Sequence, residues 1–295
     1  MKLEEFYARH KTVQTRAGEI GYFDSAGDGM AKDRAVLFVH GIGTNGYLWR
    51  HVIGLLQADH RCVAVDLPLH GRTPAADDQD FSFQGFASVL EAFCQAAGLT
   101  RIDLVGNDTG GGISQVFAAR RPDLLRSMVL TNCEAHDNFP PPAFTESVAR
   151  AARGEIAPYA IHVFENLDQV RKGGELGRAY ENPERLSDET IRCYLGPVFA
   201  NLATARQYER VLTSLKAEDL LAVEPELKRL PVPVLIVWGN ADVFFEVRWA
   251  YWLRDTLPGA REVVEIAGGK LFFPEERPAE FAESLRAHLA SLSDT

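Results

Sequence analysis

The chain has 295 residues, of which 46% are hydrophobic and 24% charged, a composition that predicts one large core and excludes a disordered protein. Its net charge of -10 argues against nucleic-acid binding, because phosphate recognition requires clustered basic residues. No apolar stretch reaches the roughly 18 residues of a membrane span, and the first residues lack the apolar segment of a secretion signal. The four cysteines lack C-x-x-C spacing. We therefore expect free thiols and a cytoplasmic protein with neither nucleic-acid nor membrane partners.

The predicted elements alternate between strands and helices through the first half of the chain. Segments around 12–15 and 19–23 flank the turn Ala17-Gly18 and predict a hairpin. Apolar runs without interruption, typical of buried strands, follow at 35–39, 62–65, 102–105 and 128–130. Helical patterns separate these runs at 48–57, 83–97 and 112–120. Such an alternation is typical of a parallel sheet that helices cover on both faces.

The alternation stops after Cys133. Three prolines follow Phe139, and helical stretches then continue from 145 to about 230 without a strand. Strands resume at 232–238 and 262–266, before a final helix over 279–292. We therefore predict an α/β fold with a mostly parallel eight-stranded sheet, helices on both faces and an inserted helical cap. The core would comprise residues 1–133 and 231–295, and the cap residues 134–230.

The apolar run 102–105 leads into Gly106-Asn107-Asp108-Thr109-Gly110-Gly111, which opens the next predicted helix. The glycines around Asp108 allow a sharp strand-to-helix turn that lifts its side chain above the sheet. A carboxylate in this place attacks alkyl carbon by displacement or ring opening, and water must then cleave the resulting ester. The turn therefore favours dehalogenation or epoxide opening over peptide cleavage.

A second loop, His40-Gly41-Ile42-Gly43, follows the run at 35–39 and is called the oxyanion loop below. Its glycines let the backbone turn and direct amide donors into the site. We expect Ile42 and Gly43 to form an oxyanion hole together with the backbone N–H of Thr109. His40 is interpreted as a buried imidazole that braces this loop, with a direct contact to substrate as the alternative.

Residues 40–50, the segment Asp66-Leu67-Pro68-Leu69-His70-Gly71-Arg72-Thr73 and the turn at Asp108 together resemble the α/β-hydrolase superfamily. An aspartate in place of the usual nucleophilic serine resembles the haloalkane dehalogenases and, less closely, the epoxide hydrolases. The resemblance covers nearly the whole chain. It implies an α/β-hydrolase fold in which Asp108 is the nucleophile and His70 has a structural role.

The resemblance also implies an acid and a histidine that together activate water. Asp242, just after the strand at 232–238, occupies the acid position, and Glu134 is the alternative acid. The histidine is missing, because the loop that should hold it reads Gly268-Gly269-Lys270-Leu271. Leu271 stands in the histidine position or, with a slip of one residue, Lys270 does.

Several substitutes for the missing histidine stay open. Lys270 would serve only if it were strongly desolvated. Alternatively a histidine comes from elsewhere, with His136 at the start of the cap ahead of His162. Otherwise Asp108 acts as an acid or base in a lyase or isomerase that forms no ester, or the protein binds a ligand without turnover.

The substrate is predicted from the residues around these loops. The positions with which haloalkane dehalogenases hold the halide carry Thr109 and Ile42, and Gly43 replaces the loop proline of epoxide hydrolases. Cap tyrosines that would donate to an epoxide oxygen are Tyr159, Tyr180, Tyr194 and Tyr208. Aromatic residues predict an apolar pocket, with substrate contacts from Trp49, Phe139, Phe245 and Phe272 and further candidates in Phe164, Phe244 and Phe273.

No cluster of histidines and cysteines has the spacing of metal ligands, and no phosphate-binding glycine motif occurs, so we expect no metal and no cofactor. The expected partner is a small apolar molecule, and a homodimer stays open. Our leading hypothesis is a hydrolase that attacks a haloalkane, an epoxide or a related electrophile through a covalent alkyl ester on Asp108.

Overall fold

The computed structural model describes residues 1–27, 30–160 and 162–292. Its centre is an eight-stranded sheet with the order β1-β2-β4-β3-β5-β6-β7-β8, in which β1 and β2 pair antiparallel, β2 and β4 pair antiparallel, and all other neighbours are parallel. The strands are β1 (His10–Thr15), β2 (Gly18–Asp24), β3 (Arg34–Val39), β4 (Cys62–Val65), β5 (Arg101–Asn107), β6 (Leu125–Thr131), β7 (Val234–Gly239) and β8 (Ala260–Ile266). The predicted hairpin and the mostly parallel sheet are confirmed.

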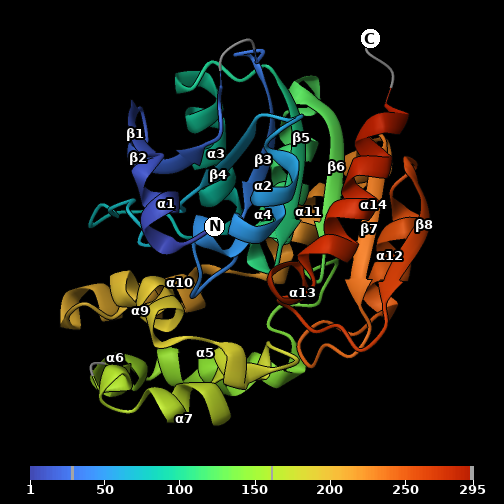
Figure 1. The fold of residues 1–295 in the computed structure, drawn as a ribbon. Coiled ribbons are helices and arrows are strands. Elements are labelled where there is room, and N and C mark those ends of the chain that lie inside the picture. The colour runs from blue at the N-terminus through green and yellow to red at the C-terminus, as the bar shows by residue number, and fades with distance from the viewer. Residues whose placement is uncertain (28–29, 161, 293–295) are drawn as a thin grey trace.

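Helices cover both faces of the sheet (Figure 1). On one face α2 (Arg50–Leu56) packs against α14 (Pro278–Ser291), and on the other α3 (Phe83–Ala96), α4 (Thr109–Arg120) and α11 (Ala217–Leu227) pack together. The short helix α1 (Leu3–Ala8) precedes the sheet, α12 (Arg248–Thr256) lies against β7 and β8, and α13 (Phe273–Glu276) leads into α14. All residues of β4 and β7 are buried, which explains why these strands are apolar without alternation.

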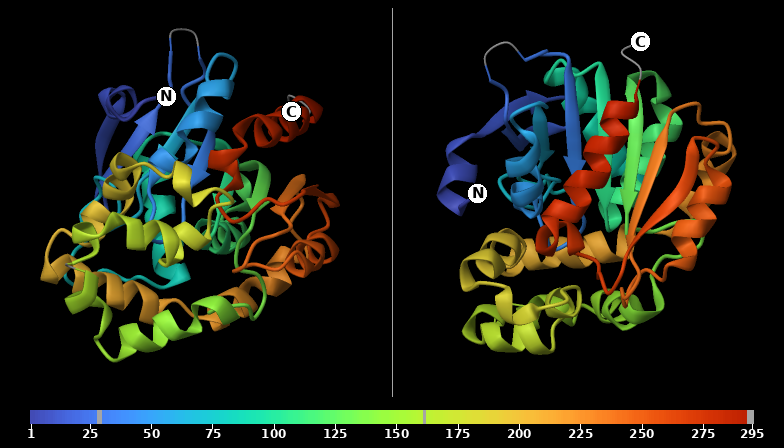
Figure 2. Two further views of the ribbon diagram at one scale, coloured as in Figure 1. Left: turned by 60° about the horizontal axis from the view of Figure 1, so that its bottom comes forward. Right: turned by 45° about the vertical axis from the view of Figure 1, so that its right-hand side comes forward.

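A helical insertion connects β6 to β7 and gathers at the carboxyl ends of the parallel strands (Figures 1 and 2). Its helices are α5 (Thr145–Ala152), α6 (Ile156–Ala160), α7 (Leu167–Lys172), α8 (Glu175–Arg178), α9 (Asp188–Val198) and α10 (Leu202–Ser214), with short 3-10 turns between some of them. The last helix of the stretch, α11, returns to the core and packs against α4. The insertion therefore covers the edge of the sheet at which the turn of Asp108 lies.

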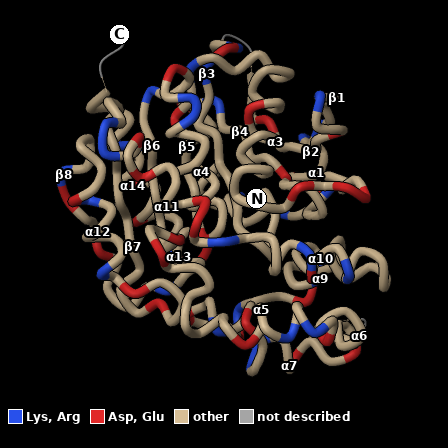
Figure 3. Tube along the Cα trace, turned by 180° about the vertical axis from the view of Figure 1, so that it is seen from behind, with Lys and Arg blue, Asp and Glu red and all other residues tan. Residues whose placement is uncertain are grey.

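Acidic and basic residues intermingle along the chain in the view from behind (Figure 3). Many form surface ion pairs, such as Arg121 with Asp123 at 2.7 Å. Within the described ranges, no helix combines the length and apolar character that crossing a membrane requires.

Candidate active site

Asp108 lies at the tight turn between β5 and α4, with φ at +55°. Glycines are required around it because the backbone passes very close to its neighbours. A Cβ on Gly106 would lie 2.6 Å from the carbonyl oxygen of Gly110, and a Cβ on Gly110 would lie 2.4 Å from the carbonyl oxygen of Val39. Both contacts are too short for any side chain, so the glycine pattern and the left-handed aspartate together define the turn.

The carboxyl group of Asp108 lies in the oxyanion loop. The backbone N–H groups of Thr109 and Ile42 donate hydrogen bonds to it. Gly41 passes so close that a Cβ there would lie 2.1 Å from Oδ2 of Asp108. The two segments predicted to share a site are thus in direct contact, and two of the three expected amide donors, Ile42 and Thr109, converge on one carboxyl. These donors can also stabilise an oxyanion formed at the carboxyl carbon of Asp108. The third expected donor, Gly43, donates its N–H to Nε2 of His70 instead.

His40 stabilises the oxyanion loop through hydrogen bonds of both its ring nitrogens. Its Nδ1–H donates to the carbonyl oxygen of Gly41 at 2.7 Å, and Nε2 accepts from the backbone N–H of Leu67 at 2.9 Å. Burial lowers the pKa of His40 to about 4, so the imidazole is neutral at physiological pH. His70 supports the same loop, because its Nε2 accepts from the backbone N–H of Gly43 at 3.1 Å. Neither histidine lines the cavity that lies between Asp108 and the cap helices.

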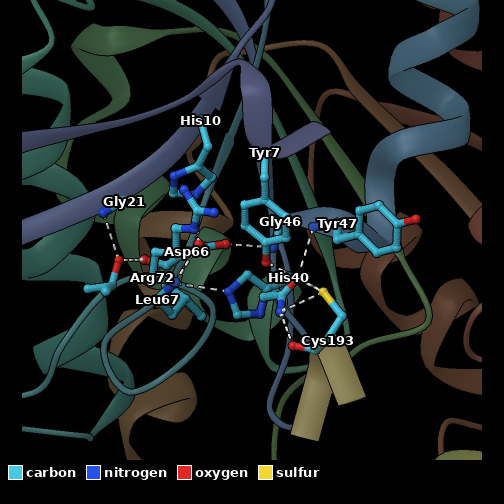
Figure 4. Close-up of polar contacts among 12 residues, drawn as sticks. Tyr7, His10, Gly21, His40, Gly46, Tyr47, Asp66, Leu67, Arg72 and Cys193 are labelled. Carbon is cyan, nitrogen blue, oxygen red and sulfur yellow. Dashed lines mark hydrogen bonds and ion pairs between the residues drawn. The ribbon is translucent and has the colours of Figure 1, made fainter. Parts of the chain in front are cut away.

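A polar network around Asp66, next to His40, fixes the segment 66–73 (Figure 4). The Asp66 carboxylate accepts backbone N–H groups of Gly46 at 2.9 Å and Arg72 at 2.8 Å, and pairs with His10 at 2.9 Å. His10 and its neighbours hold the pKa of Asp66 below its usual range against the opposing effect of burial. The segment 66–73 therefore has a structural role here.

A cavity of about 530 Å³ lies between Asp108 and the cap helices. Around Asp108 its walls are mainly apolar and aromatic, with Phe139, Leu195, Phe245, Leu271 and Phe272. Three of the predicted substrate contacts thus line the cavity. Trp49 does not, because it is fully buried in the core against Phe38 and Phe281.

Two further carboxyl groups flank Asp108. Glu134, just after β6, lines the cavity and is 1% exposed. Its Oε1 accepts from the hydroxyl of Thr109 at 3.0 Å, whereas Oε2 makes no hydrogen bond within the described part of the chain. Burial raises the pKa of Glu134 to about 7. Burial, together with repulsion from Glu134 and Asp242, raises the pKa of Asp108 well above its usual range.

Asp242 occupies the loop after β7, as predicted for an orienting acid. Its carboxylate accepts from Nδ2 of Asn132 at 3.0 Å and from the backbone N–H groups of Phe244 and Phe245 at 3.1 and 3.2 Å. Burial nevertheless raises the pKa of Asp242 to about 6. Asp242 is not among the residues that line the cavity, so its carboxylate acts on Asp108 through charge.

Leu271, one of the two positions at which the resemblance implies a histidine, is buried and lines the cavity. The carbonyl oxygen of Leu271 accepts from Nδ2 of Asn107 at 3.0 Å, which ties this loop to the turn of Asp108. Lys270 lies outside the cavity lining. His136 also lies outside it, where it pairs with Glu224 at 2.9 Å and stacks on Trp252.

Among the other candidates in the cap, only some reach the cavity. His162 lines its outer part and pairs at 3.1 Å with Glu165, with both side chains largely exposed. Tyr180 and Tyr194 are directed elsewhere, since both hydroxyls donate to Glu275, at 2.7 and 2.8 Å.

Tyr208 on α10 lines the cavity, and its hydroxyl has no hydrogen-bond partner among the described residues. A Cβ on Gly43 would lie 3.4 Å from this hydroxyl, so Tyr208 points toward the oxyanion loop. Burial, Glu175 and Asp108 raise its pKa above the usual range, which keeps the phenol protonated. Tyr159 lines the outer part and is half exposed.

The part of the cavity lining that comes from α5 and α8 is more polar than the sequence predicts. It includes Arg150, Arg178 and Glu175, and the hydroxyl of Ser147 donates to Glu175. Burial raises the pKa of Glu175 to about 7. These residues come from short cap helices with ordinary surface composition, so no motif in the sequence marks them. No group of three histidine, cysteine or acidic residues in the described ranges is arranged to hold a metal ion.

Comparisons with known proteins find relatives and solved structures that match most of this chain. Epoxide hydrolase 3 of Xenopus tropicalis is 23% identical over 282 residues, which is 90% of this chain and 74% of that protein. A pimeloyl acyl-carrier protein methyl ester esterase of Neisseria meningitidis is 27% identical over 240 residues, 78% of this chain and 84% of the esterase. The solved structure of the epoxide hydrolase CorEH covers 96% of this chain and 99% of its own, with a TM-score of 0.76 and 20% identity.

A family model described as the alpha/beta hydrolase fold matches residues 34–277, which include the oxyanion loop, the turn of Asp108 and the loop of Leu271. This match spans well over half of the chain. The protein therefore belongs to the alpha/beta hydrolase fold family.

Proposed function

We propose that this protein is a hydrolase that opens a small apolar electrophile by forming a covalent alkyl ester on Asp108. The observation that carries the proposal is the position of the Asp108 carboxyl, which faces the cavity and accepts the amide N–H groups of Ile42 and Thr109. One oxygen can attack an alkyl carbon while the amides hold the other. The same amides then stabilise the oxyanion when water attacks the ester.

An epoxide is the favoured substrate, ahead of a haloalkane. The hydroxyl of Tyr208 faces the cavity beside the oxyanion loop and has no partner of its own among the described residues, so it can donate a hydrogen bond to an epoxide oxygen. The similarity to Epoxide hydrolase 3 of Xenopus tropicalis supports the same substrate class. The phenylalanines near Asp108 favour an apolar substituent. Within the predicted cap, residues 134–230, helices α5 to α10 act in this proposal as the cap of a cytoplasmic enzyme without a cofactor, whereas α11 packs against the core.

The test is single turnover of styrene oxide in heavy-oxygen water, with the intact protein and its peptides weighed. We expect a transient adduct on Asp108 and, after its hydrolysis, one heavy oxygen in the carboxylate of Asp108, because water attacks the carboxyl carbon of the ester. Asp108→Ala should form no adduct and no diol. Label that appears only in the diol would mean direct attack of water on the epoxide and would refute the covalent step. Turnover that consumes no water would instead favour a lyase or isomerase.

A further inference from the structure

Resting on the proposed function, we propose that Glu134 is the acid and base of the reaction: its carboxyl proton goes to the opening epoxide oxygen and is recovered from the water that cleaves the ester. This carboxyl would do the work for which the related enzymes use a histidine. The structural basis is its place in the cavity wall beside Asp108, with one oxygen fixed and the other free to bind a reacting group.

The position of Glu134 is rigid. Its backbone carbonyl oxygen accepts from Nε2 of Gln115 at 2.7 Å, and its Oε1 accepts from the hydroxyl of Thr109 at 3.0 Å. Thr109 is the residue next to Asp108 and one of the two amide donors to the Asp108 carboxyl. A single residue therefore holds both carboxyls, and Oε2 of Glu134 is left without a hydrogen bond in the described structure.

The other candidates for the base are less well placed. Both oxygens of Asp242 already accept hydrogen bonds, Oδ1 from Phe244 and Oδ2 from Asn132 and Phe245, and this residue does not line the cavity. Lys270 and His136 do not line it either. Among the described residues around Asp108, Glu134 thus combines contact with the cavity and an oxygen without a hydrogen bond.

The two carboxyls share one proton at neutral pH. Burial raises both pKa values, and repulsion prevents both groups from ionising together. The backbone N–H groups of Ile42 and Thr109 donate to Asp108, and the hydroxyl of Thr109 and the backbone N–H of Glu134 itself donate to the Glu134 carboxyl. The proposed reaction starts from the form of this pair in which the charge lies on Asp108, the nucleophile, and the proton on Glu134.

The proposed steps balance with this single proton. In the first step an oxygen of Asp108 bonds to the epoxide carbon, the carbon–oxygen bond breaks, and the epoxide oxygen takes the proton of Glu134. The product is a hydroxyalkyl ester beside an ionised Glu134. In the second step Glu134 takes a proton from water while the water oxygen attacks the ester carbon. Collapse releases the diol, with the hydroxyl proton of the attacking water transferred to the departing alkoxide, and restores ionised Asp108 and protonated Glu134.

The experiment compares Glu134→Gln with the wild-type protein on two probes. Glutamine has nearly the same size and retains an oxygen that accepts from Thr109, but it neither gives nor takes a proton. With 1-bromobutane, whose bromide leaves without a proton, Glu134 must first release its proton to solvent before it can act as the base. We expect the variant to form the adduct on Asp108 and to hydrolyse it at least about a hundredfold more slowly than the wild type at about pH 8, where Glu134 of the wild type is ionised. With styrene oxide, adduct formation itself should also slow.

Two further variants complete the design. Glu134→Asp keeps a carboxyl that is one methylene shorter, and partial recovery of ester hydrolysis is expected. Glu224→Gln makes the same chemical change outside the cavity, at the partner of His136, and should hydrolyse both probes at the wild-type rate.

The outcomes separate the two proposals. Wild-type rates of adduct hydrolysis in Glu134→Gln, or an adduct equally persistent in wild type and variant, would overturn the role of Glu134 while supporting the covalent ester. Absence of any adduct on Asp108 in all proteins, with either probe, would overturn the proposed function and this inference with it.

Discussion

Replacing Glu134 by glutamine should change how the stability of the folded protein depends on pH. Glu134 is 1% exposed, and burial raises its pKa from the usual 4.5 to about 7. Between these values the folded protein binds more protons at this group than the unfolded chain does. The contribution of Glu134 to stability is therefore complete below pH 4.5 and is lost as the pH rises through about 7.

The magnitude follows from the two pKa values. The difference between about 7 and 4.5, at about 1.4 kcal/mol per pKa unit, gives about 3 kcal/mol by which ionising Glu134 destabilises the folded protein above neutral pH. Glutamine does not ionise. The side-chain NH2 of the glutamine takes the place of Oε2, which has no hydrogen-bond partner among the described residues. The free-energy cost of burying this amide group does not depend on pH. The free energy of unfolding of Glu134→Gln, relative to the wild type, should thus rise by about 3 kcal/mol between about pH 4.5 and pH 8.

The assay is urea unfolding of both proteins at intervals across this range, followed by tryptophan fluorescence. Glu224→Gln is the matched control with the opposite sign. Lys228 and His136 hold the pKa of Glu224 below its usual value, so its charge stabilises the folded state at neutral pH and that contribution is lost on acidification. Parallel pH profiles for Glu134→Gln and the wild type would show that Glu134 is not a desolvated carboxyl and would refute the reasoning.

Three other changes test the rest of the site. Leu271→His, made in the Glu134→Gln background, should restore hydrolysis of the bromobutane adduct by at least about a hundredfold, because Leu271 lines the cavity and an imidazole in its place could act as the base. An unchanged rate of adduct loss would contradict this. Gly41→Ala should slow adduct formation by at least about a hundredfold, since its Cβ would lie 2.1 Å from Oδ2 of Asp108; the rise of the adduct mass measures this, and wild-type formation would contradict it. Tyr208→Phe should alter the free energy of unfolding by less than about 1 kcal/mol, because the hydroxyl has no partner within the described chain. The same change should slow adduct formation with styrene oxide and leave adduct formation with 1-bromobutane unchanged. Equal effects on both probes would argue against donation to the epoxide oxygen.

The sequence by itself determined the order of the strands and helices and the turn of Asp108. Both depend on local patterns. Apolar runs at 62–65 and 102–105 become buried parallel strands because both of their faces are covered, and the glycines around Asp108 are the residues that a close backbone approach requires. The oxyanion loop was predictable for the same reason, since Gly41 has room for no side chain beside Asp108.

Only the tertiary structure decided which side chains share the cavity. Of the four cap tyrosines, Tyr208 points toward the oxyanion loop while Tyr180 and Tyr194 bond to Glu275, and nothing in the spacing of these residues distinguishes them. Trp49 and His136 lie outside the cavity although both lie near its loops in the sequence. The pKa of Glu134 likewise depends on burial and on neighbours distant in the chain. Side-chain direction and desolvation are set by long-range packing, which no local pattern of residues encodes.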